Sequence, residues 1–401
     1  MKIKTILIVF ILLTLITCKP QNIDSSSSGS NQERIINIKE NLPNNSAMMF
    51  VQNLSIGINI GNTLDAIGTN HWHAGETGWG NPQITRDLIR ALKNYGYKTI
   101  RLPVTWAEYI GPAPDYLIGD CVFADCVRCP NRMDRVAEVV NWILEEDLYC
   151  IINLHHDGGH SDKSWILNAS NNPEETSAKF TAVWKQIAQK FSGVSQDRLI
   201  FESMNEIGFD DLWNRWSGGL SGKSEAFGLV NMLNQTFVDT VRSAEGNENR
   251  FLLIAGYWTD ITLTCDPFFI LPSDKTEHRL ILSVHYYDPS IFTIAEEHDN
   301  NWGFADNWGS PADYQHLTEQ LNKLKINFFD KGVPVIIGEY GVTFRNKKEE
   351  DRVKWMAAVT QYSLNYGICP ILWDTGGEIS RRPPYIMRET LKAVWEKVEI
   401  N

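Results

Sequence analysis

Eight short runs of β-forming residues recur along the chain, and this repeat constrains the fold more than any other feature. The runs lie at 55–61, 99–104, 149–156, 199–206, 251–258, 280–287, 334–341 and 369–376. They are nearly continuous in apolar residues, which is typical of parallel strands buried on both faces. Turn residues bound each run, and stretches with helical periodicity separate most of them.

The intervening stretches predict amphipathic helices. Stretch 85–95 begins at a capping residue, Thr85, and Gly96 ends it. Apolar residues recur at helical spacing in 133–144 and 180–191 as well. Strands that alternate with helices predict an α/β fold, a (β/α)8 TIM barrel that forms a single domain from 46 to 401 with long βα loops.

An open doubly wound sheet is the alternative architecture. Its dinucleotide-binding form needs a third glycine in the first turn, and a helix that follows directly. The turn at 57–62 reads GINIGN, which lacks that glycine, and no helical pattern follows at once. The barrel is therefore favoured.

Residues 1–18 predict an export signal. Lys2 and Lys4 precede an uncharged, mostly apolar stretch at 5–17 that is too short to span a bilayer. Cys18 follows it in a pattern that resembles a bacterial lipoprotein signal, although Thr17 replaces the usual small residue before the cysteine. We expect an exported protein with a lipid on Cys18, at the cell surface or outer membrane. Plain secretion and a retained anchor helix are the alternatives.

The composition after the leader limits the partners. Residues 19–45 are rich in Ser, Asn and Gln, which predicts a flexible tether. The formal charge is −12, from 37 basic and 49 acidic side chains, and no basic block occurs, so nucleic acid is excluded as a partner. We expect a monomer that contacts the membrane only through the N-terminal lipid.

Polar residues gather where the predicted strands end. The carboxyl ends of barrel strands form one face, and that face carries the active site in TIM barrels. Six strands end in this way, with Arg101; Asn153, His155 and His156; Asn205 and Glu206; His285, Tyr286 and Tyr287; Glu339; and Trp373 and Asp374.

Two carboxylates dominate this set, Glu206 and Glu339, and they end strands on roughly opposite sides of the ring. Cleavage of a glycosidic bond needs such a pair, about 5–5.5 Å apart for direct attack and ~6.5–9.5 Å apart when a water intervenes. Arg101 would keep one carboxylate ionised as a nucleophile. Burial and repulsion would raise the pKa of the other.

Eight motifs together resemble glycoside hydrolase family 5, and in particular the bacterial endoglucanases of its subfamily 4. The motifs are GINIGNTLDA (57–66), ETGWGNP (76–82), IRLPVTW (100–106), NLHHD (153–157), MNE (204–206), SVHYY (283–287), IGEYG (337–341) and LWD (372–374). Each is short, but their order and their placement at strand ends are specific.

The resemblance implies roles for the two acids. Glu206 would protonate the leaving oxygen and later activate water, and Glu339 would form the glycosyl-enzyme, with net retention of configuration. Arg101 and Tyr287 would hold Glu339. We take Tyr287 in preference to Tyr286 because adjacent side chains of a strand point in opposite directions.

Further contacts are implied by the same resemblance. His155 and His285 would orient the two acids, and Asn205 would bond the 2-hydroxyl of the reacting sugar. Trp373 would stack beneath that sugar, and the glycone-side contacts would be Asn62 and His156.

The implied activity is that of a retaining endo-β-1,4-glucanase acting on cellulose, mixed-linkage β-glucan or xyloglucan. A mannanase or an exo-glucosidase of the same fold is an alternative, as is a non-catalytic surface glycan-binding lipoprotein. The last is disfavoured because binding alone needs neither a neutral acid nor a nucleophile. No cofactor is expected.

Two further patterns are set aside. Cys121, Cys126 and Cys129 have a spacing also found in iron–sulfur sites, but in an exported protein we expect a local disulfide, with the third thiol free or paired with Cys265. The second pattern, which could indicate zinc, comprises His155, His156, Asp157 and His160. We expect no metal, because the first strand lacks the His-x-His of metal-dependent barrel hydrolases.

Tryptophan is abundant, with 14 residues. Trp142 and Trp184 fall on apolar helix faces and are predicted to be core. The others in strand ends or loops favour platforms for sugar rings: Trp72, Trp79, Trp106, Trp213, Trp216, Trp258, Trp302, Trp308 and Trp373.

Overall fold

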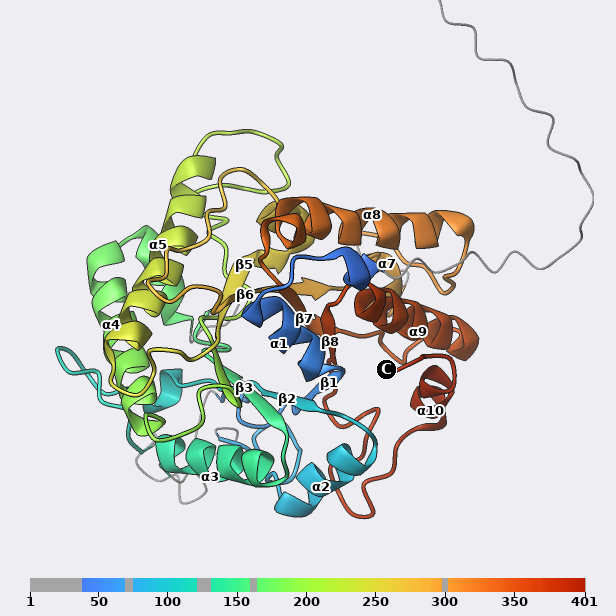
Figure 1. Cartoon of the computed structure of the whole chain (residues 1–401), viewed down its shortest axis with the longest axis horizontal. Coiled ribbons are helices and arrows are strands. Elements are labelled where there is room, and N and C mark those ends of the chain that lie inside the picture. The colour runs from blue at the N-terminus through green and yellow to red at the C-terminus, as the bar shows by residue number, and fades with distance from the viewer. Residues whose placement is uncertain (1–37, 69–74, 121–130, 159–163, 298–301, 401) are drawn as a thin grey trace, which may run out of the picture. The chain divides into compact units, whose positions relative to one another are not determined.

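The computed structural model describes residues 38–68, 75–120, 131–158, 164–297 and 302–400. Its strands close into a barrel in chain order, and every neighbouring pair is parallel (Figure 1). They are β1 (Gly57–Asn59), β2 (Thr99–Leu102), β3 (Tyr149–Asn153), β4 (Leu199–Glu202), β5 (Leu252–Asp260), β6 (Leu280–Tyr286), β7 (Val335–Tyr340) and β8 (Cys369–Leu372). The predicted barrel is confirmed, and the doubly wound alternative is wrong.

Helices surround the barrel (Figure 1). The α-helices are α1 (Ser46–Leu54), α2 (Arg86–Asn94), α3 (Arg132–Glu145), α4 (Pro173–Lys190), α5 (Lys223–Ser243), α6 (Ile261–Thr264), α7 (Ser290–Thr293), α8 (Pro311–Asn327), α9 (Glu349–Asn365) and α10 (Glu389–Trp395). Short 3-10 turns are η1 (Ile38–Asn41), η2 (Ala107–Tyr109), η3 (Trp165–Ser170) and η4 (Phe329–Lys331). Within the described ranges no helix is both long and apolar enough to span a bilayer.

Capping residues decide where the helices begin. The Thr85 hydroxyl accepts a hydrogen bond from the backbone N–H of Leu88, as predicted for the start of α2. Helix α4 begins at Pro173, earlier than the predicted 180, because Asn172 caps it and proline is favoured in a first helical turn. The prediction counted only the apolar face, and that face begins later than the helix.

Most strands end earlier than the predicted runs, although β5 continues to Asp260, beyond the predicted 258. Strand β4 ends at Glu202, so Glu206 lies four residues farther on, in the βα loop. Its φ of 45° is uncommon for a residue other than glycine and turns the chain out of the strand direction. His155 and Trp373 likewise follow the ends of β3 and β8. The candidate site residues therefore lie partly in the strands and partly in the loop segments that directly follow them.

Helix α1 fills the amino-terminal end of the barrel and lies at the centre of the ring of helices (Figure 1). Its buried residues, among them Phe50 and Leu54, form one core cluster with inward residues such as Ile151, Ile200 and Ile336. A larger cluster packs the outer face of the barrel against the helices. Apolar packing thus closes one end, and the polar groups are left to the other.

The folded part starts no later than Ile38, earlier than the predicted 46. Turn η1 lies in the stretch assigned to the tether, and Asn45 caps α1 while its Nδ2 donates to the Gly332 carbonyl at 2.8 Å. The leader, Cys18 and the tether up to residue 37 lie outside the described residues, so they stay predictions.

Candidate active site

Arg101 is the centre of the polar face. It lies on β2, is fully buried, and bonds groups from three other strands and loops. Its Nη1 is 2.7 Å from Glu339 Oε1 and 3.0 Å from Asn59 Oδ1. Its Nη2 donates to Asn205 Oδ1 and its Nε to Glu202 Oε2, both at 2.7 Å. One guanidinium therefore fixes β1, β4 and β7 relative to one another.

Glu339 lies on β7 and is 5% exposed. Besides Arg101, the Tyr287 hydroxyl donates to its Oε2 at 3.0 Å, so both carboxylate oxygens are held as expected. Burial raises the pKa of Glu339, and the nearby Glu206 adds to that rise, although His285 and Arg101 oppose it. The expected lowering by Arg101 is thus outweighed by burial.

Glu206 faces Glu339 and is more open to solvent. His285 Nδ1 is 2.7 Å from Glu206 Oε1 and 3.6 Å from Glu339 Oε2. A carboxylate oxygen of each glutamate and a nitrogen of His285 all lie within 4.8 Å of one another. Burial by itself would raise the pKa of Glu206, but the hydrogen bond and charge of His285 lower it.

The two tyrosines that follow His285 point in opposite directions. Tyr287 reaches Glu339, whereas Tyr286 is buried and stacks on Trp355 of α9 with ring centroids 5.8 Å apart. The choice of Tyr287 as the partner agrees with this geometry.

His155 differs from its expected place beside the acids. Its Nδ1 is 3.2 Å from Asn153 Nδ2, and its ring lies parallel to that of Trp373 at 5.7 Å. Among the described residues it makes no hydrogen bond or ion pair with either glutamate. Of the two histidines expected to orient the acids, His285 bonds Glu206, whereas His155 contacts Asn153 and the rings of Trp373 and His156.

The other predicted substrate contacts line the same face. The ring of His156 lies 4.6 Å from that of His155 and 5.5 Å from that of Trp79. Asn62 is half-buried in the loop after β1, with φ 56°, and its backbone N–H donates to Asp65 Oδ2 at 3.0 Å.

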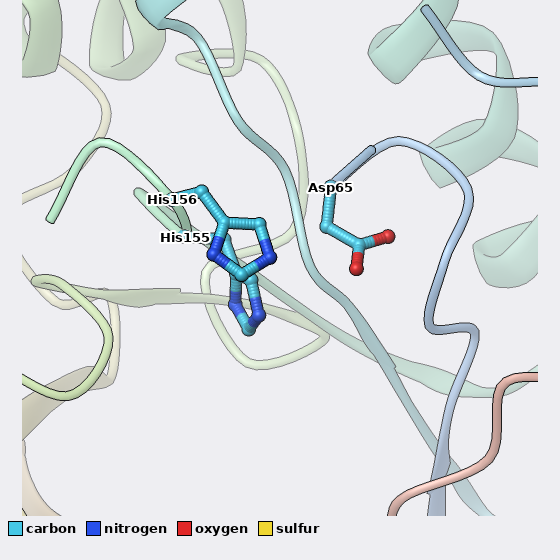
Figure 2. Close-up of side chains that lie close together, drawn as sticks. All are labelled: Asp65, His155 and His156. Atoms are coloured by element: carbon cyan, nitrogen blue, oxygen red, sulfur yellow. The ribbon is translucent and has the colours of Figure 1, made fainter. Parts of the chain in front are cut away.

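Among the residues that the structure describes, two groups of side chains come close enough to hold a cation. Figure 2 shows one, Asp65 with His155 and His156, whose ligand atoms lie within 4.8 Å; the other is the pair of glutamates with His285. Both oxygens of Asp65 already accept backbone N–H groups, from Asn62 and Thr63, and burial raises its pKa to about 6. Asp65 therefore stabilises the loop after β1 by accepting these backbone hydrogen bonds. The expected absence of a metal stays a prediction.

Comparisons with known proteins place this geometry in a family. The family described as Cellulase (glycosyl hydrolase family 5) matches residues 61–378. The chain belongs to this family.

Similar proteins support the assignment. The chain is 37% identical over 333 residues to Endoglucanase A of Ruminococcus albus, covering 82% of this chain and 84% of that one. It is 31% identical over 390 residues to a xyloglucan-specific endo-beta-1,4-glucanase of Bacteroides ovatus, covering 88% and 72%. A GH5-4 broad specificity endoglucanase from Ruminococcus champanellensis, solved with cellotriose, aligns at a TM-score of 0.75 with 30% identity, covering 89% and 99%. The protein is a glycoside hydrolase that resembles subfamily 4.

This family 5 site contains groups that sequence reasoning left unassigned. Asn59 on β1 donates through Nδ2 to the carbonyls of Gly338 and Leu372, at 2.9 and 3.2 Å. Glu202 on β4 binds Arg101 and is fully buried. A polar residue inside an apolar strand was the available signal, because such a side chain must find a partner.

The tryptophans of this glycoside hydrolase divide into core and surface. Trp106, Trp213, Trp258 and Trp308 are buried, so the prediction that they are platforms is wrong. Trp184 is buried as predicted, and Trp142 is half-buried. Trp79, Trp216 and Trp302 are exposed, and Trp72 lies outside the described residues. Periodicity identifies helix faces, but it does not show which loop tryptophans fold inward.

Two hollows meet at Tyr287. The larger, of about 910 Å³, contains Glu206 and His285 and is lined by Trp216, Trp258 and Trp302. The smaller, of about 530 Å³, is lined by Trp373 and by residues of the loops after β7 and β8. The two hollows therefore adjoin each other on this face, and Glu206 lines the larger one.

Cys265 is a free thiol, as are the buried Cys150 and Cys369. Cys121, Cys126 and Cys129 lie outside the described residues, as does His160. A disulfide among the three loop cysteines stays a prediction. The alternative in which the third thiol pairs with Cys265 is wrong, because Cys265 is free.

Proposed function

We propose that this protein is a retaining endo-β-1,4-glucanase that uses Glu339 as nucleophile and Glu206 as acid and base. The short separation of the two carboxylates carries this proposal. One oxygen of each carboxylate lies within 4.8 Å of the other, which fits the spacing of about 5–5.5 Å between carboxyl groups for direct attack better than the ~6.5–9.5 Å of an inverting enzyme.

In the first step Glu339 attacks the anomeric carbon. Arg101 and Tyr287 hold its two oxygens, so the attacking lone pair is oriented before the substrate arrives. Glu206 transfers its proton to the leaving oxygen as the glycosidic bond breaks.

Substrate binding sets the protonation states. Two carboxylates this close share one proton, and in the free enzyme burial raises the pKa of Glu339 while His285 lowers that of Glu206. The Glu206 side chain is 39% exposed and that of Glu339 is 6% exposed, so a bound sugar mainly buries Glu206. Added burial raises the pKa of Glu206 and moves the proton to the acid.

In the second step Glu206 removes a proton from water, which attacks the anomeric carbon and releases Glu339. His285 bonds Glu206 in its ionised form and stabilises it for this role. Two displacements restore the original β configuration.

The remaining side chains bind the sugar chain. Asn205 Oδ1 is occupied by Arg101, which directs Nδ2 toward a substrate hydroxyl, for which we propose the 2-hydroxyl. Trp373 would stack beneath the sugar, backed by the parallel ring of His155. Asn62 and His156 would contact the glycone side.

An extended site favours cleavage within chains. The larger hollow contains Glu206, so it would take the leaving part of the chain, and its exposed tryptophans, Trp216 and Trp302, fit pyranose faces. Relatives named for endoglucanase and xyloglucan-specific activity point to β-1,4-glucans, including branched ones, as substrates.

A polysaccharide panel tests the proposal. The protein is incubated with cellulose, mixed-linkage glucan, xyloglucan and mannan, and the products are sized over time. We expect mid-length oligosaccharides early from β-1,4-glucans, and loss of turnover in Glu206→Ala and Glu339→Ala. Release of single glucose units would indicate an exo-glucosidase, preference for mannan a mannanase, and binding without products a glycan-binding protein.

A further inference from the structure

A third carboxylate, Glu202, lies in the layer below the two glutamates. It is fully buried on β4, opposite Asn153 of β3 in the strand register. Its Oε2 accepts from Arg101 Nε at 2.7 Å and from Asn153 Nδ2 at 3.1 Å. Its Oε1 accepts from the Ser283 hydroxyl of β6 at 2.6 Å. Both oxygens are thus bonded inside the protein, and the proposed chemistry makes no use of this group.

Arg101 lies between Glu202 and Glu339. Its Nε and Nη1 contact the two carboxylates at the same distance, 2.7 Å, on two edges of one planar guanidinium. If Glu339 were the one carboxylate bonded to Arg101, the full charge of the buried guanidinium would act on Glu339. The guanidinium plane could also tilt about that single contact. The second carboxylate, Glu202, fixes the plane of the guanidinium and offsets part of its positive charge.

We propose that Glu202 is a positioning residue that fixes Arg101 and limits how strongly Arg101 stabilises ionised Glu339. The proposal rests on Glu339 being the nucleophile. A carboxylate held by an undivided positive charge is a weaker nucleophile, because the same interaction that ionises it lowers its basicity. With Glu202 in place, Arg101 would still ionise Glu339 and Glu339 would stay basic enough to attack.

Other groups around Arg101 and Glu339 also influence titration. The titratable ones are Glu206 from the loop after β4, His285 and Tyr287 from β6 and its end, His155 after β3, and Asp65 after β1. Asn59 and Asn205 are neutral partners of Arg101. Glu202 is the carboxylate that bonds Arg101 without facing the hollows, so its charge can be changed while those groups stay in place.

The test is Glu202→Gln, which keeps the shape and removes the charge. The amide oxygen still accepts from Arg101, and the amide nitrogen donates to Ser283, whose hydroxyl also accepts. We expect the acid limb of kcat/KM against pH to move down by about 0.5 to 1 unit, because Glu339 loses a nearby negative charge and gains the full attraction of Arg101. We expect kcat to fall about tenfold and KM to stay within about twofold, since Glu202 does not face the substrate.

Ser283→Ala is the matched control. It removes a neutral hydrogen bond to Glu202 and no charge, so the acid limb should stay in place. A folded Glu202→Gln protein whose acid limb is unchanged or moves up would overturn the proposal. Wild-type protein that cleaves no glucan would instead contradict the proposed function, which separates the two failures.

Glu202→Asp covers the case in which Glu202→Gln does not fold. The charge remains but the shorter side chain withdraws it from Arg101 Nε, so kcat should fall about tenfold with an acid limb that moves by less than about 0.3 unit. Wild-type kcat in this variant would show that Arg101 needs no fixing, and would overturn the proposal.

Discussion

At the residue scale, the site separates its two glutamates by what each one touches. Glu339 has a donor on each oxygen and is almost fully buried, whereas Glu206 has His285 and an open side. A sugar that covers the site therefore changes the surroundings of Glu206 more than those of Glu339. The division of roles follows from this difference in burial and contacts.

Tyr287→Phe tests the hold on the nucleophile. The change removes the hydroxyl that donates to Glu339 Oε2 at 3.0 Å and leaves the ring. A lost donor to an ionised carboxylate raises its pKa, so the acid limb of kcat/KM should move to higher pH, opposite to the shift expected for Glu202→Gln. We expect kcat to fall about tenfold or more. A pH profile identical to wild type would show that the hydroxyl has no part in ionising Glu339.

At the element scale, several helices, among them α1, α2, α4 and α8, begin where a side chain accepts a hydrogen bond from an N–H group of the first turn. Helix α8 has a full capping box, in which Ser310 accepts from the N–H of Asp313 and the Asp313 carboxylate accepts from that of Ser310. The exposed first turn thus depends on two side chains rather than on burial.

Ser310→Ala should lower the free energy of unfolding by about 1 kcal/mol and leave hydrolysis unchanged. Chemical denaturation measures the first and an endpoint assay the second. Ser243→Ala is the control, since Ser243 bonds the Thr240 carbonyl at the end of α5, where loss of a hydroxyl should change the unfolding free energy by less than ~0.5 kcal/mol. Equal effects of the two changes would argue against a capping contribution.

The sequence predicts elements better than the details of the site. Near-continuous apolar runs located the eight strands, and helical periodicity located α2, α3 and the apolar part of α4, because burial imposes both patterns. Polar residues at strand ends marked the face of the barrel. These patterns did not place His155, which follows β3 and turns toward Asn153 and Trp373. They also missed Glu202, since the contact that gives Glu202 its use is with Arg101, 101 residues away in the chain.

At the whole-molecule scale, the two ends of the barrel differ in composition: one is packed with apolar side chains and the other holds the polar site. Helix α1 and apolar side chains fill one end, so buried charges such as Arg101 can be concentrated at the other, where partners from several strands compensate them. The two adjoining hollows on that face are where we propose that the sugar chain lies.

We propose that the whole protein is exported and held to a membrane by a lipid on Cys18. Cells that express the protein with labelled palmitate should show label on the wild type and none on Cys18→Ala. Cys369→Ala is the control, because that thiol is buried in β8 and cannot react in the folded protein. Unlabelled wild-type protein in the medium would favour plain secretion.

The most direct test of the account is azide rescue of Glu339→Ala with an aryl β-cellobioside. Azide fits the space of the missing carboxylate and attacks from the face that Glu339 would use, so we expect rate recovery and an α-glycosyl azide, identified by NMR. The same assay on Glu206→Ala should give the β-glycosyl azide, because Glu339 still forms the intermediate. A β-azide from Glu339→Ala, or wild-type activity without azide, would contradict the assignment of Glu339 as nucleophile.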